Sequence, residues 1–337
     1  MPRRLRTPLI LLAALLLLHS AAWLWAARHL AAAADGWLAA QRARGVSISA
    51  DAPVRGGWPL GVSLTWPRIA IADPAVPLAW SGEGVTLAAS LLHPRHATLD
   101  LAGPQMLRLA DLPPLAITAD RFDLDVRIGA DGRAHGAGLA AHGLRISGDG
   151  AAIGVASLSL SADGTGPGRR FGLHAEAIAL PGTPPARLAL ARWPFGPAIQ
   201  RLGLDATLSG TLPPDPRASA AWMRAWQQAG GALAIDDLNL DWGPLDVTAN
   251  ARLAADPTGQ PIASMQSEIG GWQAAADALA AAGLVTAQTL RPAKLLLSLM
   301  AHTDAPGGPS TLSVPLNLDG GTLSMGRMPL AQLPPLP

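Results

Sequence analysis

The chain has 337 residues, of which 49% are hydrophobic and 15% are charged, and its net charge at pH 7 is +1. A charge balance so close to neutral provides no field that attracts nucleic acid, so no nucleic-acid partner is expected. The sequence contains no cysteine, which excludes disulfides, thiolate nucleophiles and thiolate metal sites. The length accommodates one large β domain or two smaller ones.

The N-terminus has the pattern of a membrane anchor. Residues 1–6 carry three arginines, and residues 7–27 contain no Asp, Glu, Lys or Arg. About 20 apolar residues cross ~30 Å of hydrocarbon as an α-helix. Because the arginines precede the span, the positive-inside rule predicts a cytoplasmic tail at 1–6, a transmembrane anchor at 7–27 and the rest of the chain across the membrane. A cleaved signal peptide is the alternative, but Trp23 and Trp25 suit the membrane interface of an uncleaved anchor.

A connecting helix is predicted over residues 28–45. Leu30, Ala34 and Leu38 recur at helical spacing, and Gly45 is a natural helix stop. The segment is either an amphipathic helix that lies on the membrane or a stalk that caps the following domain. Its apolar side is mostly alanine, which favours the cap.

After Val46 the hydrophobic period changes from helical to two. In the clearest strand, Phe122, Leu124 and Val126 alternate with charged residues, and an Asp131-Gly132 turn follows. Similar alternation marks residues 62–66, 99–101, 158–160, 202–208, 245–253 and 312–318. We therefore predict a mainly β fold: a large, curved, antiparallel meander sheet, open or folded on itself, with a few packing helices and one N-terminal transmembrane helix.

Helices interrupt the strands in the C-terminal part. One is predicted at 219–228, after the proline-rich breaker at 213–216, and a helical pair is predicted at 271–282 and 292–301. The β domain is accordingly divided into an N-terminal part at 46–212 and a C-terminal part with helical insertions at 213–337. The proline-rich stretch at 181–197 is the candidate loop or boundary.

No local motif carries chemistry. Pro94 lies between His93 and His96 and breaks the spacing that a two-histidine metal site needs. Asp123 and Asp125 lie on the polar face of a predicted strand, where solvation explains them. We therefore predict no catalytic, metal-ligating or cofactor-binding residue, no cofactor and no enzymatic activity. A hydrolase whose site is assembled from distant residues is the remaining alternative.

Consecutive one-sided strands make a sheet with a single apolar face, and the predicted helices are too few to cover all of it. Such a sheet must close, fold on itself or leave an apolar trough that suits an acyl chain. The candidate lining of the trough is Trp58, Trp66, Phe122, Leu124, Val126 and Trp242. Ordinary core packing is the alternative interpretation of the tryptophans.

Three stretches together resemble a known family. They are Gly-Gly-Trp-Pro-Leu at 56–60, the segment 230–245 that ends in Asp-Trp-Gly-Pro-Leu, and the ending Asp-Gly-Gly-Thr-Leu at 319–323 followed by Met-Pro-Leu-Ala-Gln-Leu-Pro-Pro-Leu at 328–336. With the anchor, they resemble the bacterial domain-of-unknown-function family 2125 over nearly the whole chain. The resemblance implies no activity and no catalytic residues. A looser architectural similarity to AsmA-like envelope proteins implies an association with lipid movement or envelope homeostasis.

We therefore expect a single-pass protein of the bacterial inner membrane with most of its chain in the periplasm. Its expected function is to bind or guide a lipid-like molecule in the cell envelope. The alternative is a non-enzymatic interaction scaffold for another envelope protein. The expected partners are thus the inner membrane, a lipid and another envelope protein.

Overall fold

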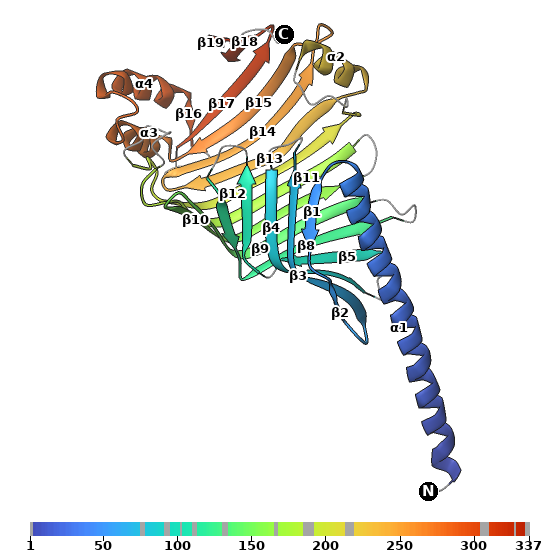
Figure 1. Cartoon of the computed structure of the whole chain (residues 1–337). Helices are drawn as coiled ribbons and strands as arrows, with labels where there is room; N and C mark the ends of the chain where they lie inside the picture. Colours follow the sequence, from blue (N-terminus) through green and yellow to red (C-terminus); the bar gives the residue numbers. More distant parts are fainter. Residues whose placement is uncertain are drawn as a thin grey trace. The chain divides into compact units, whose positions relative to one another are not determined.

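The protein is described by a computed structural model and consists mostly of β-strands (Figure 1). The structure describes residues 3–74, 78–90, 95–101, 103–109, 113–129, 134–164, 168–184, 192–212, 219–303, 310–326 and 328–333. The chain divides into two compact units, Met1–Gly150 and Ala151–Pro337. The boundary expected between residues 212 and 213 falls inside the second unit. The other candidate boundary, the proline-rich stretch at 181–197, also lies inside this unit, because the strands before and after it pair with each other.

A single helix, α1 (Arg3–Ala43), covers both the predicted anchor and the predicted connecting helix. Its 41 residues extend over about 60 Å. Among the described residues, α1 is the one helix that is long and apolar enough to cross a membrane. It ends where predicted, because Gly45 adopts a positive φ of 92° that favours glycine.

The first unit contains the strands β1 to β9, and their pairings are antiparallel. Their bounds are β1 Ser47–Ala50, β2 Val54–Gly56, β3 Gly61–Asp73, β4 Leu78–Ser90, β5 His96–Leu101, β6 Gln105–Leu109, β7 Leu115–Thr118, β8 Arg121–Ile128 and β9 Ala134–Gly148. Strand β3 pairs with β1, β2 and β4, while β8 pairs with β5 and β9. The prediction of a strand around Phe122–Val126 is confirmed by β8.

In β3 and β4, the alternation of inward-facing and outward-facing residues is reversed at one point. Trp66 pairs with Val85 and Arg68 with Glu83, so Pro67 and Gly84 lie opposite each other. Gly84 has a φ of 64°, and proline has no amide hydrogen to give to the ladder. On β3 the buried side chains accordingly change from the even position of Trp66 to the odd position of Ile69.

The C-terminal half of α1 covers this inward face. Leu38 of α1 forms a buried cluster with Leu64, Trp66, Ile69 and Val85. Other helix side chains packed against the cluster are Leu30, Ala31 and Ala34. The sequence-based interpretation of this segment as a cap is therefore confirmed, and α1 belongs to the hydrophobic core of the first unit.

The second unit is a meander with helical insertions (Figure 1). Its strands are β10 Ala151–Asp163, β11 Gly168–Ala179, β12 Ala198–Ser209, β13 Ala232–Trp242, β14 Leu245–Ala255, β15 Pro261–Gly270, β16 Ala301–His302, β17 Thr311–Asp319, β18 Thr322–Met325 and β19 Met328–Gln332. Each strand from β10 to β15 pairs antiparallel with the next, and β15 pairs with β17. The predicted mainly β meander is confirmed. The predicted turn at 131–132 and breaker at 213–216 lie outside the described residues.

Three helices in the described part of the second unit can be compared with the sequence-based boundaries. Helix α2 (Ala220–Gln228) begins as predicted, with the Ser219 side chain accepting a hydrogen bond from the Trp222 amide at 3.2 Å. Helix α3 (Trp272–Ala281) also matches. Helix α4 (Ala287–Met300) starts five residues before the predicted position at Pro292. The prediction was wrong there because a first turn, closed by the hydrogen bond from Leu290 N to Thr286 O, forms before the proline.

Candidate functional site

Seven strands of the second unit place apolar side chains on one continuous surface. We call this surface the apolar face. Across the registers of β10 to β15 and β17 it comprises Leu158, Leu160, Phe171, Leu173, Leu202, Leu204, Leu208, Leu233, Ile235, Leu238, Leu240, Val247, Leu253, Met265, Ile269, Leu312, Val314, Leu316 and Leu318, with small residues between them. With a strand spacing of about 4.8 Å it extends roughly 29 Å across the sheet. The polar Ser267 on this face donates its hydroxyl hydrogen to Val314 O at 3.0 Å.

A β-bulge keeps this face apolar where two acidic residues interrupt β13. The register between β12 and β13 shifts at Asp236-Asp237, so the inward positions pass from Ile235 to Leu238. Both aspartates are exposed. Asp236 accepts a hydrogen bond from Thr207 Oγ1, and Asp237 accepts one from Asn239 Nδ2, each at 2.9 Å. These carboxylates are therefore bulge residues and not a polar pocket.

Aromatic side chains close both ends of the apolar face. At one end, Met223 and Trp226 of α2 pack against Leu208 and Leu233, and the indole of Trp226 donates to Ser209 O. The other end is a separate cluster around the β13–β14 turn.

In that cluster, Trp242 meets the ring of Phe195 edge-on, with ring centroids 5.1 Å apart, and Trp193 at 6.2 Å. The indole of Trp242 donates to Gly196 O at 2.9 Å. Each end is thus fixed by packed rings, and the indoles of Trp226 and Trp242 both donate to backbone carbonyls.

Between these ends the large side chains keep contact with solvent. Small residues such as Ala175 and Ala249 are buried, but Leu173, Leu204 and Leu238 are only half-buried. At the β10–β11 side, Leu160 is 36% exposed and Phe171 is 39% exposed. An apolar surface of this extent that stays partly accessible is typical of a binding surface.

The predicted trough residues fall in three places. Trp66 is 6% exposed and packed under α1. Phe122, Leu124 and Val126 are half-buried on β8. Leu124 pairs with Leu99 of β5, so both side chains lie on the same side of the sheet. Trp242 lies at the end of the apolar face of the second unit. Trp58 is 55% exposed in the loop between β2 and β3, so the structure does not bring the six residues together.

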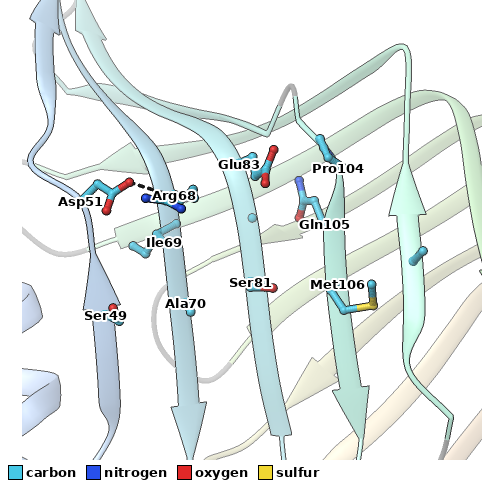
Figure 2. Close-up of a pocket in the computed structure, with 12 residues that line it drawn as sticks. Ser49, Asp51, Arg68, Ile69, Ala70, Ser81, Glu83, Pro104, Gln105 and Met106 are labelled. Atoms are coloured by element: carbon cyan, nitrogen blue, oxygen red, sulfur yellow. Dashed lines mark hydrogen bonds and ion pairs between the residues drawn. The ribbon is translucent and has the colours of Figure 1, made fainter.

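The opposite side of the first unit contains a depression of about 630 Å³ with a mixed polar and apolar lining. Figure 2 shows Ser49, Ala70, Ser81 and Met106 along its floor, from β1, β3, β4 and β6. At its rim, Arg68 Nε donates to Asp51 Oδ2 at 2.9 Å; this hydrogen bond and the aspartate charge raise the pKa of Arg68.

The described lining of the depression contains no Ser-His-Asp arrangement. None of the described residues that line it is a histidine, so its serines have no base of the kind that a Ser-His-Asp arrangement needs. Across the described part of the chain, no group of three or more His, Asp or Glu side chains is placed to hold a metal ion. His93 lies outside the described residues, and His96 pairs with Arg127 in the β5–β8 register.

Two acidic residues face each other on the polar side of the first unit. Asp100 of β5 lies opposite Asp123 of β8. Desolvation by neighbouring atoms raises the pKa of Asp100 above its ordinary value of 3.8, and the charge of Asp123 raises it further, while Arg121 lowers it. The folded protein therefore binds this proton more tightly than the unfolded chain, and stability falls as pH rises through the pKa range of Asp100.

The variant Asp100→Asn should consequently be more stable than the natural chain at pH 7, because it removes the repulsion between two carboxylates. The gain should be small, since Asp100 is exposed and solvent screens its charge. It should disappear near pH 3, where Asp100 is protonated. Urea unfolding of the full chain at both pH values measures it; an equal gain at both would contradict the electrostatic cause.

Comparison with protein families shows what most of the chain is similar to. The family model described as "Uncharacterized protein conserved in bacteria (DUF2125)" matches residues 23–334. The match includes the C-terminal half of α1 and nearly all of both units. No curated protein and no solved structure matches the chain.

Proposed function

We propose a lipid-binding function in the cell envelope for this chain, which belongs to the bacterial family DUF2125. In this proposal, α1 anchors the protein in the inner membrane and the apolar face of the second unit holds a lipid-like molecule. The observation that carries the proposal is the half-buried state of the large side chains on that face, between two packed aromatic ends. The protein would bind or guide its ligand without chemical change.

The proposed location follows from the charge distribution around α1. The basic residues Arg3, Arg4 and Arg6 precede the uncharged stretch, which by the positive-inside rule supports a cytoplasmic N-terminus and a periplasmic position for both units. Leucine side chains of the helix remain 48–72% exposed, as expected for contact with lipid; these are Leu11, Leu12, Leu15, Leu16, Leu17 and Leu18. An anchored protein has continuous access to membrane lipids, which would supply the ligand.

The chemistry of the apolar face favours an acyl chain over a polar ligand. Apart from Ser267, whose hydroxyl is bonded to Val314 O, and Arg169, which lies opposite Leu208 at one end, its side chains are apolar and offer neither charge nor hydrogen bonds. Binding energy would therefore come from the burial of apolar area, at roughly 25 cal/mol per Å². Leu160 and Phe171 would gain most, because they are the most exposed of the large side chains on this face.

A photoreactive phenylalanine analogue at position 171 tests the proposal directly. In cells irradiated with the full-length protein in its membrane, we expect adducts whose mass increase corresponds to a lipid. The matched control is the same analogue at His174, which is 51% exposed but lies on the polar side of the same strand. Lipid adducts at position 171 and none at 174 would support the proposal, whereas equal labelling or no labelling at 171 would refute it.

The interaction-scaffold alternative is favoured by a different observation. Helix α4 carries Leu295, Leu296 and Leu299 with 67%, 63% and 78% of their surface exposed. The pair Lys294 Nζ–Asp277 Oδ1, at 2.6 Å, ties α4 to α3. The same photoreactive analogue at Leu296 distinguishes the two functions: specific protein adducts there, with no lipid adducts at 171, would favour the scaffold.

A further inference from the structure

The loop between β2 and β3 is bonded to the side of α1. This loop, residues 57–61, comprises the turn between the two strands of a hairpin in the first unit and Gly61, the first residue of β3. His19 Nε2 donates to the carbonyl oxygen of Pro59 at 2.8 Å, and Trp23 Nε1 donates to the carbonyl oxygen of Gly61 at 2.7 Å. The loop is thus held at the height of residues 19–23 of the helix.

This height lies inside the predicted membrane span. The uncharged stretch at 7–27 is about 32 Å long as a helix, which matches a hydrocarbon layer of ~30 Å. His19 lies eight residues before Ala27, or about 12 Å deeper, and Trp23 lies about 6 Å deeper. A typical tilt of ~20° shortens these depths by only about one ångström. The loop therefore extends below the surface of the layer.

A shift of the span along α1 does not remove this result. If the hydrocarbon layer ended at His19, only residues 7–19 would lie in it, a length of about 20 Å. The layer would then have to enclose Arg6 and Arg4, and charged side chains in the hydrocarbon are costly. The position that keeps the arginines outside is the one that immerses the loop.

The loop has the side chains that immersion needs. Trp58 is 55% exposed and Leu60 is 66% exposed, and Val54 on the adjoining β2 is 62% exposed. Exposure of such apolar side chains to water contributes no stabilising free energy, whereas their contact with a bilayer surface is favourable.

The backbone of the loop is also adapted to an apolar medium, in which unpaired polar groups are costly. Gly57 O accepts a hydrogen bond from Gly61 N at 2.9 Å, and proline at position 59 has no amide hydrogen. The carbonyls of Pro59 and Gly61 are paired with α1, as described above. Gly57 makes the turn possible, because its φ is 91° and a Cβ there would lie 2.8 Å from Gly61 O.

We propose that the loop at 57–61 is a second membrane-contacting element, which inserts Trp58 and Leu60 into the bilayer beside α1. The occupant of this apolar surface is the boundary between headgroups and acyl chains of the membrane that α1 crosses. The inference rests on the proposed membrane anchor. It adds that the first unit sits directly on the membrane surface with a fixed orientation, and is not held away from it on a stalk.

The absence of native cysteine allows a direct test in the full-length protein. Single cysteines at Trp58 and Leu60 are labelled with an environment-sensitive fluorophore, and the protein is reconstituted into vesicles of phosphatidylethanolamine and phosphatidylglycerol. A fraction of the lipids carries nitroxide quenchers on their acyl chains. Leu16→Cys within α1 reports on the anchor, and Arg145→Cys, exposed on β9, reports on a water-facing strand.

We expect labels at positions 58 and 60 to emit at shorter wavelength and to lose most of their fluorescence to the lipid quenchers, as the label at 16 does. The label at 145 should keep its fluorescence. Quenching at 16 but not at 58 and 60 would overturn the loop proposal and leave the anchor intact. The absence of quenching at 16 would refute the anchor itself, and the loop proposal with it.

Discussion

Replacing Leu64 with alanine is expected to lower the free energy of unfolding of the first unit by about 2–5 kcal/mol. Leu64 has no exposed surface and lies in the cluster that joins β3 to Leu38 of α1. The loss combines the removal of buried apolar area with a cavity that neighbouring strands cannot fill. Urea unfolding of the full-length protein in mild detergent, followed by tryptophan fluorescence, measures the change.

The matched control is Leu60→Ala, four residues earlier in the same hairpin and 66% exposed. In detergent it should change the unfolding free energy by less than about 0.5 kcal/mol. The double variant of Leu38 and Leu64 gives a second check. Because the two side chains belong to one cluster, their effects should not add; strict additivity would show that α1 does not pack there.

Replacing Gly271 with alanine should be at least as damaging to the second unit. Gly271 precedes α3 with a φ of 63°, and a Cβ there would lie 1.7 Å from the carbonyl oxygen of Pro244. The left-handed conformation alone costs a residue with a Cβ about 1–2 kcal/mol. The clash with backbone adds to it, so we expect a total loss above roughly 4 kcal/mol.

Gly283, just after α3, is the control for the conformational part of this loss. Its φ is 76°, close to that of Gly271, but a Cβ there would meet no atom within 4 Å. Gly283→Ala should therefore show only the cost of the left-handed backbone, about 1–2 kcal/mol. Thermal unfolding of both variants, with far-UV circular dichroism, compares them. Equal losses would mean that the contact between Gly271 and Pro244 does not form in solution.

Most strands were predictable from the sequence because each has one solvent-exposed polar side and one apolar side. The alternation in 245–253 identifies β14 without any knowledge of its neighbours. Helix α2 was equally clear, since Ser219 supplies a side-chain cap before an amphipathic segment. Helix α4 was misjudged at its start because local sequence does not reveal that a turn can form before Pro292.

The face that each residue takes was less predictable than the strands themselves. Strict alternation assigns Trp66 and Arg68 to one side, yet the opposed pair Pro67 and Gly84 reverses both strands together. The bulge at Asp236-Asp237 shifts β13 in a similar way. Such changes depend on which residues of two strands meet, and a single sequence does not contain that register.

The sequence predicted an apolar sheet surface as the candidate site, but it did not predict which residues form that surface. An apolar face on a meander followed from the pattern, and Trp242 does lie at one end of it. Phe171 was missed because arginines and glycines flank it, which weakens the alternation of its strand. Trp58 was grouped with the sheet because it precedes a strand, although the loop that carries it is hydrogen-bonded to His19 and Trp23 of α1 through the carbonyls of Pro59 and Gly61.

The continuity of α1 has a mechanical consequence. The helix runs without a break from its apolar N-terminal part to Leu38 in the core of the first unit, so no hinge separates the two. A rotation of the span, or its movement along the membrane normal, would therefore move the attached strands of the first unit together with it. For the same reason, a protease that cut the chain after residue 31 would remove not only the tether but also Leu30 from the packed interior, and the released fragment would be a weakened domain.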